Sequence, residues 1–222
     1  MLVREVKKKT DRKVMVLLED GLSFALYRRE ADQFGIREGA DLPAEIIDRI
    51  IDDLLVKRSR LRCMNLLKAS DRTTGQLKET LKRDGYPEGV IRQALEYVAS
   101  FHYTDDTRYA QNYVRLMSGK KSRRQIAYEL GKKGVDRDTI RAVLSDAYED
   151  APAREEEAIW ALARKRGLDP EKADRAELER FCRYLTGKGF DFSTIRSALP
   201  DSSVGCASAQ TVHGLWERGR ES

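Results

Sequence analysis

The chain has 222 residues, of which 42 are Lys or Arg and 37 are Asp or Glu, so its formal net charge at pH 7 is +5. Charged residues make up 36% of the chain, above the roughly 25% of an average globular protein, while 41% of the residues are hydrophobic, enough for a buried core. The longest uninterrupted apolar run, Ala158 to Ala163, has six residues, whereas a membrane-spanning helix needs about 20. The composition therefore excludes a transmembrane protein and a chain that is disordered throughout.

The N-terminal sequence carries no apolar stretch that ends in a small-residue cleavage site, so we expect a cytoplasmic protein. The chain has an odd number of cysteines, Cys63, Cys182 and Cys206, with no Cys-x-x-Cys pair. A reducing compartment keeps such cysteines as thiols. We expect Cys63 and Cys182 to fill the core and Cys206 to lie in a C-terminal tail.

The first 27 residues alternate between apolar and polar side chains, as strands do. The pattern predicts strands over 2–8, 13–19 and 22–27, with Leu22, Phe24 and Leu26 on one face. Asp20-Gly21 favours a two-residue hairpin turn between the second and third strands. We therefore expect an N-terminal antiparallel β-meander over residues 1–42.

A sheet this small needs a cover. Pro43 is a favourable first-turn residue for a helix. The apolar residues that follow recur four apart, as on one helix face: Ile46, Ile47, Ile50, Ile51, Leu54 and Leu55. We expect this helix to cover the sheet.

The remainder of the chain to about residue 199 is helical in pattern and repeats when Gly85, Gly134 and Gly189 are aligned. The copies are offset by 49 and 55 residues. Apolar residues precede each glycine by eight and four positions: Leu77 and Leu81, Ile126 and Leu130, Phe181 and Leu185. Apolar residues follow it by six and ten positions: Ile91 and Leu95, Ile140 and Leu144, Ile195 and Leu199. The spacing predicts a helix that ends at a left-handed glycine and is followed by a second helix.

An amphipathic segment before each pair adds a first helix. We expect its core residues to be Leu61, Met64 and Leu67 in the first copy, Tyr109, Tyr113 and Leu116 in the second, and Ile159, Leu162 and Ala163 in the third. The sequence therefore predicts a mainly α protein of tandem three-helix repeats in an elongated curved array. The expected divisions are a linking helix with repeat 1 over 43–104, repeat 2 over 105–150, repeat 3 over 151–200, and a disordered tail over 201–222.

Residues that would carry chemistry are sparse. The chain has two histidines, His102 and His213, and no ligand cluster with metal-binding spacing. Asp105-Asp106 is typical of a helix cap. Gly119-Lys120-Lys121-Ser122 resembles the end of a phosphate-binding loop but lacks its first glycine and the preceding strand. We expect neither an enzyme nor a cofactor.

Basic residues concentrate between residues 115 and 133, a segment that contains seven of them and a single acidic residue, Glu129. They are Arg115, Lys120, Lys121, Arg123, Arg124, Lys132 and Lys133. A second group without an acid comprises Lys57, Arg58, Arg60 and Arg62, and smaller groups are Arg28-Arg29 and Lys7-Lys8-Lys9. Each run alone is typical of a solvated helix face, but together they favour a polyanion or an acidic protein as partner.

Helix-turn-helix readers of DNA sequence place basic groups on the recognition helix. Residues 136–149, the corresponding helix of repeat 2, carry four acids against two arginines. The basic residues lie before the glycine instead. This placement favours contact with a nucleic-acid backbone or an acidic partner over the reading of base sequence.

The run Phe101-His102-Tyr103-Thr104-Asp105-Asp106-Thr107-Arg108-Tyr109-Ala110, with Arg124-Gln125-Ile126, Glu129-Leu130, Lys133-Gly134-Val135 and Ile140 downstream, resembles the central repeat of the RecX family of bacterial recombination regulators. The flanking repeats fit the tandem three-helix modules of that family, so the resemblance covers roughly residues 58–199. It implies a curved clamp that binds the RecA filament on single-stranded DNA, and we expect the chain to be a monomer. It also implies inhibition of ATP hydrolysis, filament extension and strand exchange, within DNA repair and the SOS response. The family carries no catalytic residues.

Two other functions stay open on the residues alone. One is a basic DNA-binding protein of helix-turn-helix type that acts without a recombinase. The other is a helical-repeat adaptor for an unrelated protein.

We expect the main contact edge at Lys120, Lys121, Arg123 and Arg124, with Lys132 and Lys133 further along. Further candidates for filament or DNA contact are Arg115, Arg58, Arg62, Arg92, Arg141 and Arg196. The last three recur at the same position of each repeat and so either line one face at the spacing of the repeats or form salt bridges between repeats.

Overall fold

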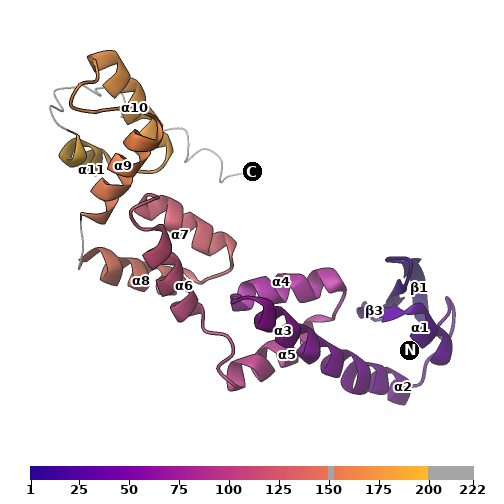
Figure 1. The fold of residues 1–222 in the computed structure, drawn as a ribbon. Coiled ribbons are helices and arrows are strands. Elements are labelled where there is room, and N and C mark those ends of the chain that lie inside the picture. The colour runs from indigo at the N-terminus through magenta and orange to yellow at the C-terminus, as the bar shows by residue number, and fades with distance from the viewer. Residues whose placement is uncertain (150–152, 200–222) are drawn as a thin grey trace. The chain divides into compact units, whose positions relative to one another are not determined.

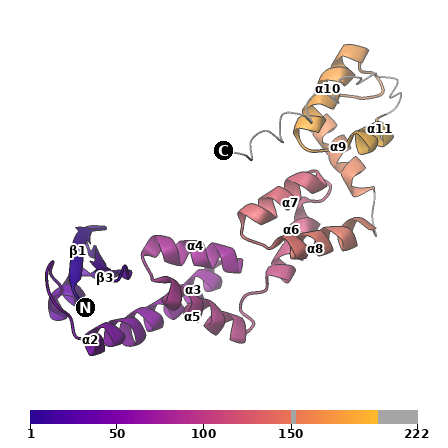
Figure 2. The same ribbon diagram turned by 180° about the vertical axis from the view of Figure 1, so that it is seen from behind.

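The computed structural model (Figures 1 and 2) describes residues 1–149 and 153–199. It is mostly helical, with a three-stranded antiparallel sheet at the N-terminus followed by three-helix repeats, as the sequence predicts. The predicted tail and Cys206 lie outside the described residues. The chain divides into two compact units: unit 1 holds Met1–Ala110 and Lys132–Thr139, and unit 2 holds Gln111–Gly131 and the chain from Ile140 onward.

The strands are β1 (Val3–Lys8), β2 (Lys13–Leu18) and β3 (Ser23–Tyr27). A short helix that the sequence did not predict, α1 (Arg28–Gln33), follows them, and then α2 (Ala44–Asp48), η1 (Arg49–Val56) and α3 (Lys57–Ala69). The first repeat continues with α4 (Thr74–Asp84) and α5 (Glu88–Ser100). The second comprises α6 (Asp106–Met117), α7 (Arg123–Lys132) and α8 (Arg137–Glu149), and the third α9 (Arg154–Lys165), α10 (Arg175–Gly187) and α11 (Phe192–Ala198).

The sheet has the order β1-β2-β3 with both pairs antiparallel. The turn between β2 and β3 is longer than the expected two residues. The Leu18 N–H donates to the Leu22 carbonyl, and the Gly21 N–H donates to the Leu18 carbonyl, which leaves three residues in the loop. Gly21 takes φ +88° and the Asp20 carboxylate accepts the Leu22 N–H at 3.0 Å, so the pair Asp-Gly closes a turn with a left-handed third residue.

The expected cover lies where the sequence places it. Phe24 and Leu26 of β3 are fully buried in one cluster with Ile50 and Leu55 of η1. The segment Arg49–Val56 is wound as a π-helix within a continuous run of helical turns. The N-terminal ammonium group donates to Asp41 and to the Leu42 carbonyl, which closes the meander against the start of α2. In both views the N-terminus lies beside α2 (Figures 1 and 2).

The repeat anchors are confirmed. The residues eight and four positions before each glycine, and six after it, are all buried. Gly85, Gly134 and Gly189 take φ +93°, +83° and +86°, so each ends its helix in the left-handed conformation. At the tenth position, Leu144 and Leu199 are buried and Leu95 is half-buried.

The predicted core of the first helices is wrong at one position in each of two copies, whereas Met64 and Leu67 pack partly buried against the core of repeat 1 and Tyr109 and Tyr113 are half-buried. Leu61 and Leu116 are 65% and 57% exposed, and the buried positions are Cys63 in α3 and Ala110 and Val114 in α6. These small side chains fill the inner face, so the larger leucines lie at the surface. The third copy agrees in part, because Ile159 and Ala163 are buried as expected and Leu162 is half-buried.

Cys63 and Cys182 are buried in the core, as predicted. Burial raises the pKa of the Cys63 thiol to about 11, although Arg62 nearby lowers it. A thiol with so high a pKa stays protonated and unreactive at neutral pH.

One hydroxyl contact recurs in the two units, and we call it the cap joint. In unit 1, Thr73 caps α4 by accepting the Gln76 N–H at 3.1 Å and donates its hydroxyl to the Lys133 carbonyl, next to Gly134. In unit 2, Ser122 precedes α7, accepts the Gln125 N–H at 3.1 Å and donates to the Lys188 carbonyl at 2.6 Å. Lys188 is next to Gly189.

A carboxylate completes each cap joint. Asp106 accepts the first N–H of α4, from Thr74, at 2.8 Å. Glu155 accepts the first N–H of α7, from Arg123, at 2.7 Å. Asp106 and Glu155 each lie in the first turn of the first helix of a repeat. This first helix and the turn at the glycine of the same repeat therefore both bind the N-terminus of the second helix of the preceding repeat.

Candidate nucleic-acid and protein interface

The turn between α6 and α7 carries the basic residues on which the sequence analysis centred. Gly119 takes φ +73°, and the N–H groups of Lys120 and Lys121 both donate to the Met117 carbonyl at 3.0 Å. Lys120 is exposed and makes no ion pair within residues 1–149 and 153–199. Its ammonium group is therefore available to a partner.

Lys121 is committed to an internal network. Its ammonium donates to both oxygens of Glu129, at 2.8 and 2.6 Å, and the Tyr113 hydroxyl donates to the same carboxylate. The hydrogen bond to Glu129 raises the pKa of Lys121. Burial pushes the pKa of Glu129 up, but the hydrogen bonds from Lys121 and Tyr113 outweigh it and hold that pKa below its ordinary value. Lys121 thus fixes the turn to α7 and offers little free charge.

Arg123 and Arg124 are exposed at the start of α7. The Arg123 guanidinium lies 5.6 Å from the ring centroid of Tyr148, and the Arg124 stem lies beside Gly189. In the described chain neither side chain makes an ion pair. Together with Lys120 they form an exposed basic surface at the N-terminal end of α7, which we call the α7 edge.

Lys132 and Lys133 lie at the opposite end of α7, which the sequence analysis placed one helix away. Lys132 is exposed, and the Lys133 ammonium lies 6.0 Å from the Tyr109 ring centroid while its carbonyl accepts the Thr73 hydroxyl. Ten residues of α7 span about 15 Å, so these lysines do not adjoin the α7 edge.

Arg58 and Arg62 bind acids of other elements. Arg58 pairs with Glu30 of α1, with both side chains about four-fifths buried, and lies 4.9 Å from the Tyr27 ring centroid. Arg62 pairs with Asp84 of α4 at 2.9 Å. Both arginines hold unit 1 together, although their run of sequence contains no acid.

Arg115 is exposed and donates to Asn112 at 3.3 Å. Of the recurring arginines, Arg92 lies 4.0 Å from Glu96 one turn further along α5, so its ion pair is within its own helix. Arg141 and Arg196 are exposed on α8 and α11.

Sequence reasoning identified Asp105-Asp106 as a cap but missed its second partner. Asp105 accepts the Arg108 N–H at 2.8 Å and so caps α6, as predicted. Asp106 accepts from Thr74 of α4 instead. The equal spacing of Thr73 to Ser122 and of Asp106 to Glu155, 49 residues in each case, is the signal that could have revealed the joint.

Within the ranges that the structure describes, no group of three or more His, Cys, Asp or Glu side chains is placed to hold a metal ion. None of the helices described is both long and apolar enough to cross a membrane.

Comparison with known proteins gives consistent results. Family models for the first and second three-helix domains of RecX match residues 60–97 and 105–144. Regulatory protein RecX of Mycobacterium bovis (strain BCG / Pasteur 1173P2) is 36% identical over 129 residues, which are 56% of this chain and 73% of the relative. Regulatory protein RecX of Clostridioides difficile (strain 630) is 26% identical over 198 residues, 88% of this chain and 92% of the relative.

Two crystal structures share the fold. One, of regulatory protein RecX, superposes with a TM-score of 0.59 at 23% identity and covers 89% of this chain and 98% of its own. The other, of RecX from Lactobacillus salivarius, gives a TM-score of 0.53 at 20% identity, covering 65% of this chain and 94% of its own. With two repeats matched by RecX domain models and 36% identity across 73% of a mycobacterial RecX, the chain belongs to the RecX family, as its motifs predicted.

Proposed function

We propose that this protein modulates the RecA recombinase by binding the RecA filament on single-stranded DNA. It slows ATP hydrolysis, filament extension and strand exchange. The proposal rests on membership of the RecX family and on the cytoplasmic setting in which a recombinase acts. The observation that carries it at the level of residues is the α7 edge, where Lys120, Arg123 and Arg124 are exposed and free of ion pairs among the described residues.

Within this proposal, the ion pairs of the described residues favour a smaller set of contact residues than the sequence alone suggests. The main contact comprises Lys120, Arg123 and Arg124. Secondary candidates are Arg115 on α6 and Lys132 on α7. Lys121, Arg58 and Arg62 support the fold through Glu129, Glu30 and Asp84 and act on a partner only indirectly. Arg92, Arg141, Arg196 and Lys133 remain lesser candidates.

The test is co-sedimentation of the protein with RecA filaments on single-stranded DNA, together with the filament ATPase rate. The variant carries Lys120→Glu, Arg123→Glu and Arg124→Glu. Reversing three charges at a complementary surface costs several kcal/mol, so we expect the affinity to fall by about a hundredfold or more and the salt dependence to weaken.

A matched control carries Lys165→Glu, Arg180→Glu and Arg183→Glu in α9 and α10. These side chains are exposed, make no ion pair in the described chain and change the net charge equally. Equal loss in both variants would show that net charge alone matters and would contradict the α7 edge. Binding of the wild-type chain to naked DNA as tightly as to the filament, with unchanged ATPase, would contradict the RecA proposal.

A further inference from the structure

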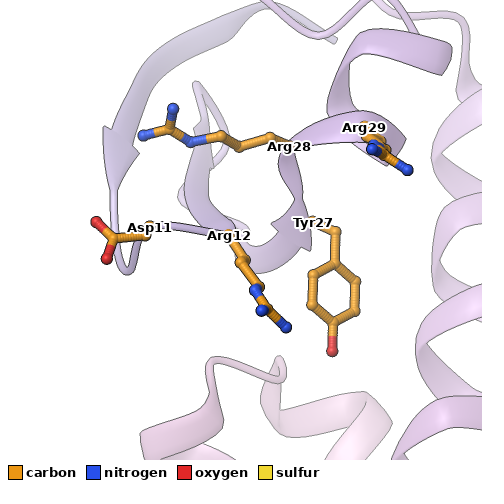
Figure 3. A pocket seen from close by; sticks show the side chains of 5 residues that line it. All are labelled: Asp11, Arg12, Tyr27, Arg28 and Arg29. Carbon is orange, nitrogen blue, oxygen red and sulfur yellow. The ribbon is translucent and has the colours of Figure 1, made fainter.

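A basic hollow lies at the end of the N-terminal sheet and shares no residue with the α7 edge. It has a volume of about 770 Å³ and is lined by Asp11, Arg12, Tyr27, Arg28 and Arg29 (Figure 3). A second hollow of about 530 Å³ shares Asp11, Arg12 and Tyr27 with it. The second hollow adds Lys9, Thr10, Lys13, Arg83 and Asp84. We call the two together the meander hollow.

Main-chain hydrogen bonds fix the walls of the meander hollow. Lys13 pairs with Tyr27 at the end of the ladder between β2 and β3, and the Arg28 N–H donates to the Arg12 carbonyl at 3.0 Å. Arg12, directly before β2, and Arg28, directly after β3 at the start of α1, are thereby held side by side. The Ala25 N–H on the outer edge of β3 donates to the Gly85 carbonyl at 2.8 Å, which holds the end of α4 with Arg83 beside the sheet.

The lining carries an excess of positive charge. Six side chains are basic and two are acidic, and both acids already have partners: Asp11 pairs with Lys8 at 2.7 Å and Asp84 with Arg62 at 2.9 Å. The lining has four arginines, Arg12, Arg28, Arg29 and Arg83. None of them makes an ion pair with a residue of 1–149 or 153–199. Burial, together with the charge of Lys13, lowers the pKa of Lys9 although Asp84 opposes the shift, so cations already crowd this wall.

Tyr27 adds an aromatic surface to the cationic wall. It is 40% exposed, and Figure 3 shows its ring beside Arg12, with both side chains pointing the same way and Arg28 and Arg29 projecting to different sides. Lys13 and Arg58 lie 5.0 and 4.9 Å from the ring centroid and hold the ring in place. An aromatic ring among unpaired cations is the combination that binds single-stranded nucleic acid, because bases stack on the ring while phosphates meet the cations.

We propose that the meander hollow is a binding site for single-stranded nucleic acid, with a base against Tyr27 and the flanking phosphates at Arg12 and Arg28. An acidic polypeptide would match the charge but would leave the aromatic ring without a role. The site is separate from the α7 edge and does not depend on the RecA proposal, because it binds the strand without a recombinase.

The experiment measures fluorescence anisotropy of a labelled oligothymidylate titrated with the full chain in the absence of RecA, at several salt concentrations. The variant is Arg12→Gln, Arg28→Gln and Arg29→Gln. We expect its affinity to fall at least tenfold and its salt slope to drop by about 1.4, since the two phosphate contacts, at Arg12 and Arg28, each contribute about 0.7 on a single strand. The matched control is Arg4→Gln, Arg37→Gln and Arg49→Gln, three exposed arginines of unit 1 outside the hollow, which should keep the wild-type affinity.

The ring is tested separately. Tyr27→Leu should weaken binding on the order of tenfold, and Tyr27→Phe should retain it, because stacking needs the ring and not the hydroxyl. The circular dichroism spectrum and melting temperature of each variant verify the fold.

Equal affinity of the two triple variants would overturn the site. Displacement of the oligothymidylate by polyglutamate at equal charge concentration, or equally tight binding of a duplex, would overturn the assignment to a single strand. If the wild-type chain bound the oligothymidylate but did not change the activity of RecA filaments, only the proposed function would be contradicted.

Discussion

Two buried hydroxyl groups, those of Thr73 and Ser122, each serve two parts of their unit at once. Each accepts an N–H of the helix that it caps and donates to a carbonyl beside a left-handed glycine. Both residues are 0% exposed, so water cannot replace either partner. A buried group that loses its partner costs more than the bond itself contributes, which makes these small side chains important for stability.

Ser122→Ala should therefore lower the free energy of unfolding by about 1 to 3 kcal/mol, because it removes the cap of α7 and leaves the Lys188 carbonyl without its donor. Urea denaturation followed by circular dichroism measures the change. Ser193→Ala is the matched control: that side chain is exposed and forms no hydrogen bond with the described residues, so its effect should stay within about 0.5 kcal/mol. Equal effects of the two substitutions would refute the cap joint in unit 2.

At this scale the sequence predicts the type of residue better than its role. The basic run from 115 to 133 is evident in the sequence, but its spacing does not indicate that Lys121 pairs with Glu129 while Lys120 makes no ion pair with the described residues. Likewise Arg58 appeared unpaired because its partner, Glu30, is 28 residues away. Ion pairs between elements depend on tertiary packing, which a local pattern does not contain.

Among the elements, α4 and the turn after α7 approach each other through two glycines. A Cβ built on Gly75 would lie 2.6 Å from the Gly134 Cα, and one built on Gly134 would lie 2.7 Å from the Gly75 Cα. The obstructing atoms are main-chain atoms and cannot swing aside. The contact therefore requires glycine on both sides.

Gly75→Ala should destabilise the protein by about 1 to 3 kcal/mol, since the added methyl group forces the backbones of unit 1 apart. Gly89→Ala is the control within a helix of the same unit: its methyl group meets nothing within 4 Å, and alanine favours a helix by up to about 1 kcal/mol. Differential scanning calorimetry should show opposite shifts in melting temperature. A rise in both would mean that the two glycines do not need their close approach.

The glycine spacing predicted the second and third helices of each repeat because a left-handed C-terminus and a four-residue apolar period are local properties. The first helices were harder to predict. Their buried faces use Cys63, Ala110 and Val114, whereas large side chains such as Leu61 and Leu116 attract attention in a sequence although they are exposed. Which face a helix buries depends on how closely its neighbours approach, and small residues permit the closest approach.

For the molecule as a whole, sequence repeats and compact units do not coincide. The second repeat contributes Lys132–Thr139 to unit 1 and most of its other described residues to unit 2. The cap joint of unit 1 explains this division, because Thr73 and Gly75 of the first repeat contact Lys133 and Gly134 of the second. Contacts between one repeat and the next leave no pattern within a single repeat. Repeat boundaries predicted from periodicity therefore do not coincide with the boundaries of the compact units.

This interleaving predicts that a substitution in one repeat loosens a helix of another. Asp106→Ala should speed hydrogen exchange in the first turn of α4, on the order of tenfold, because the Thr74 N–H loses a charged acceptor worth about 1.5 kcal/mol or more. Exchange measured by mass spectrometry on peptides from α4, α6 and α10 resolves the effect, and α10 in unit 2 should be unchanged.

Asp105→Ala provides the comparison that isolates the joint. Asp105 caps α6 through the Arg108 N–H and makes no hydrogen bond with α4 among the described residues, so its loss should speed exchange in α6 alone. If both substitutions loosened α6 and neither affected α4, the first turn of α4 would draw its protection from its own cap. Faster exchange in α4 with Asp106→Ala only would establish that the first repeat is stabilised by the repeat that follows it.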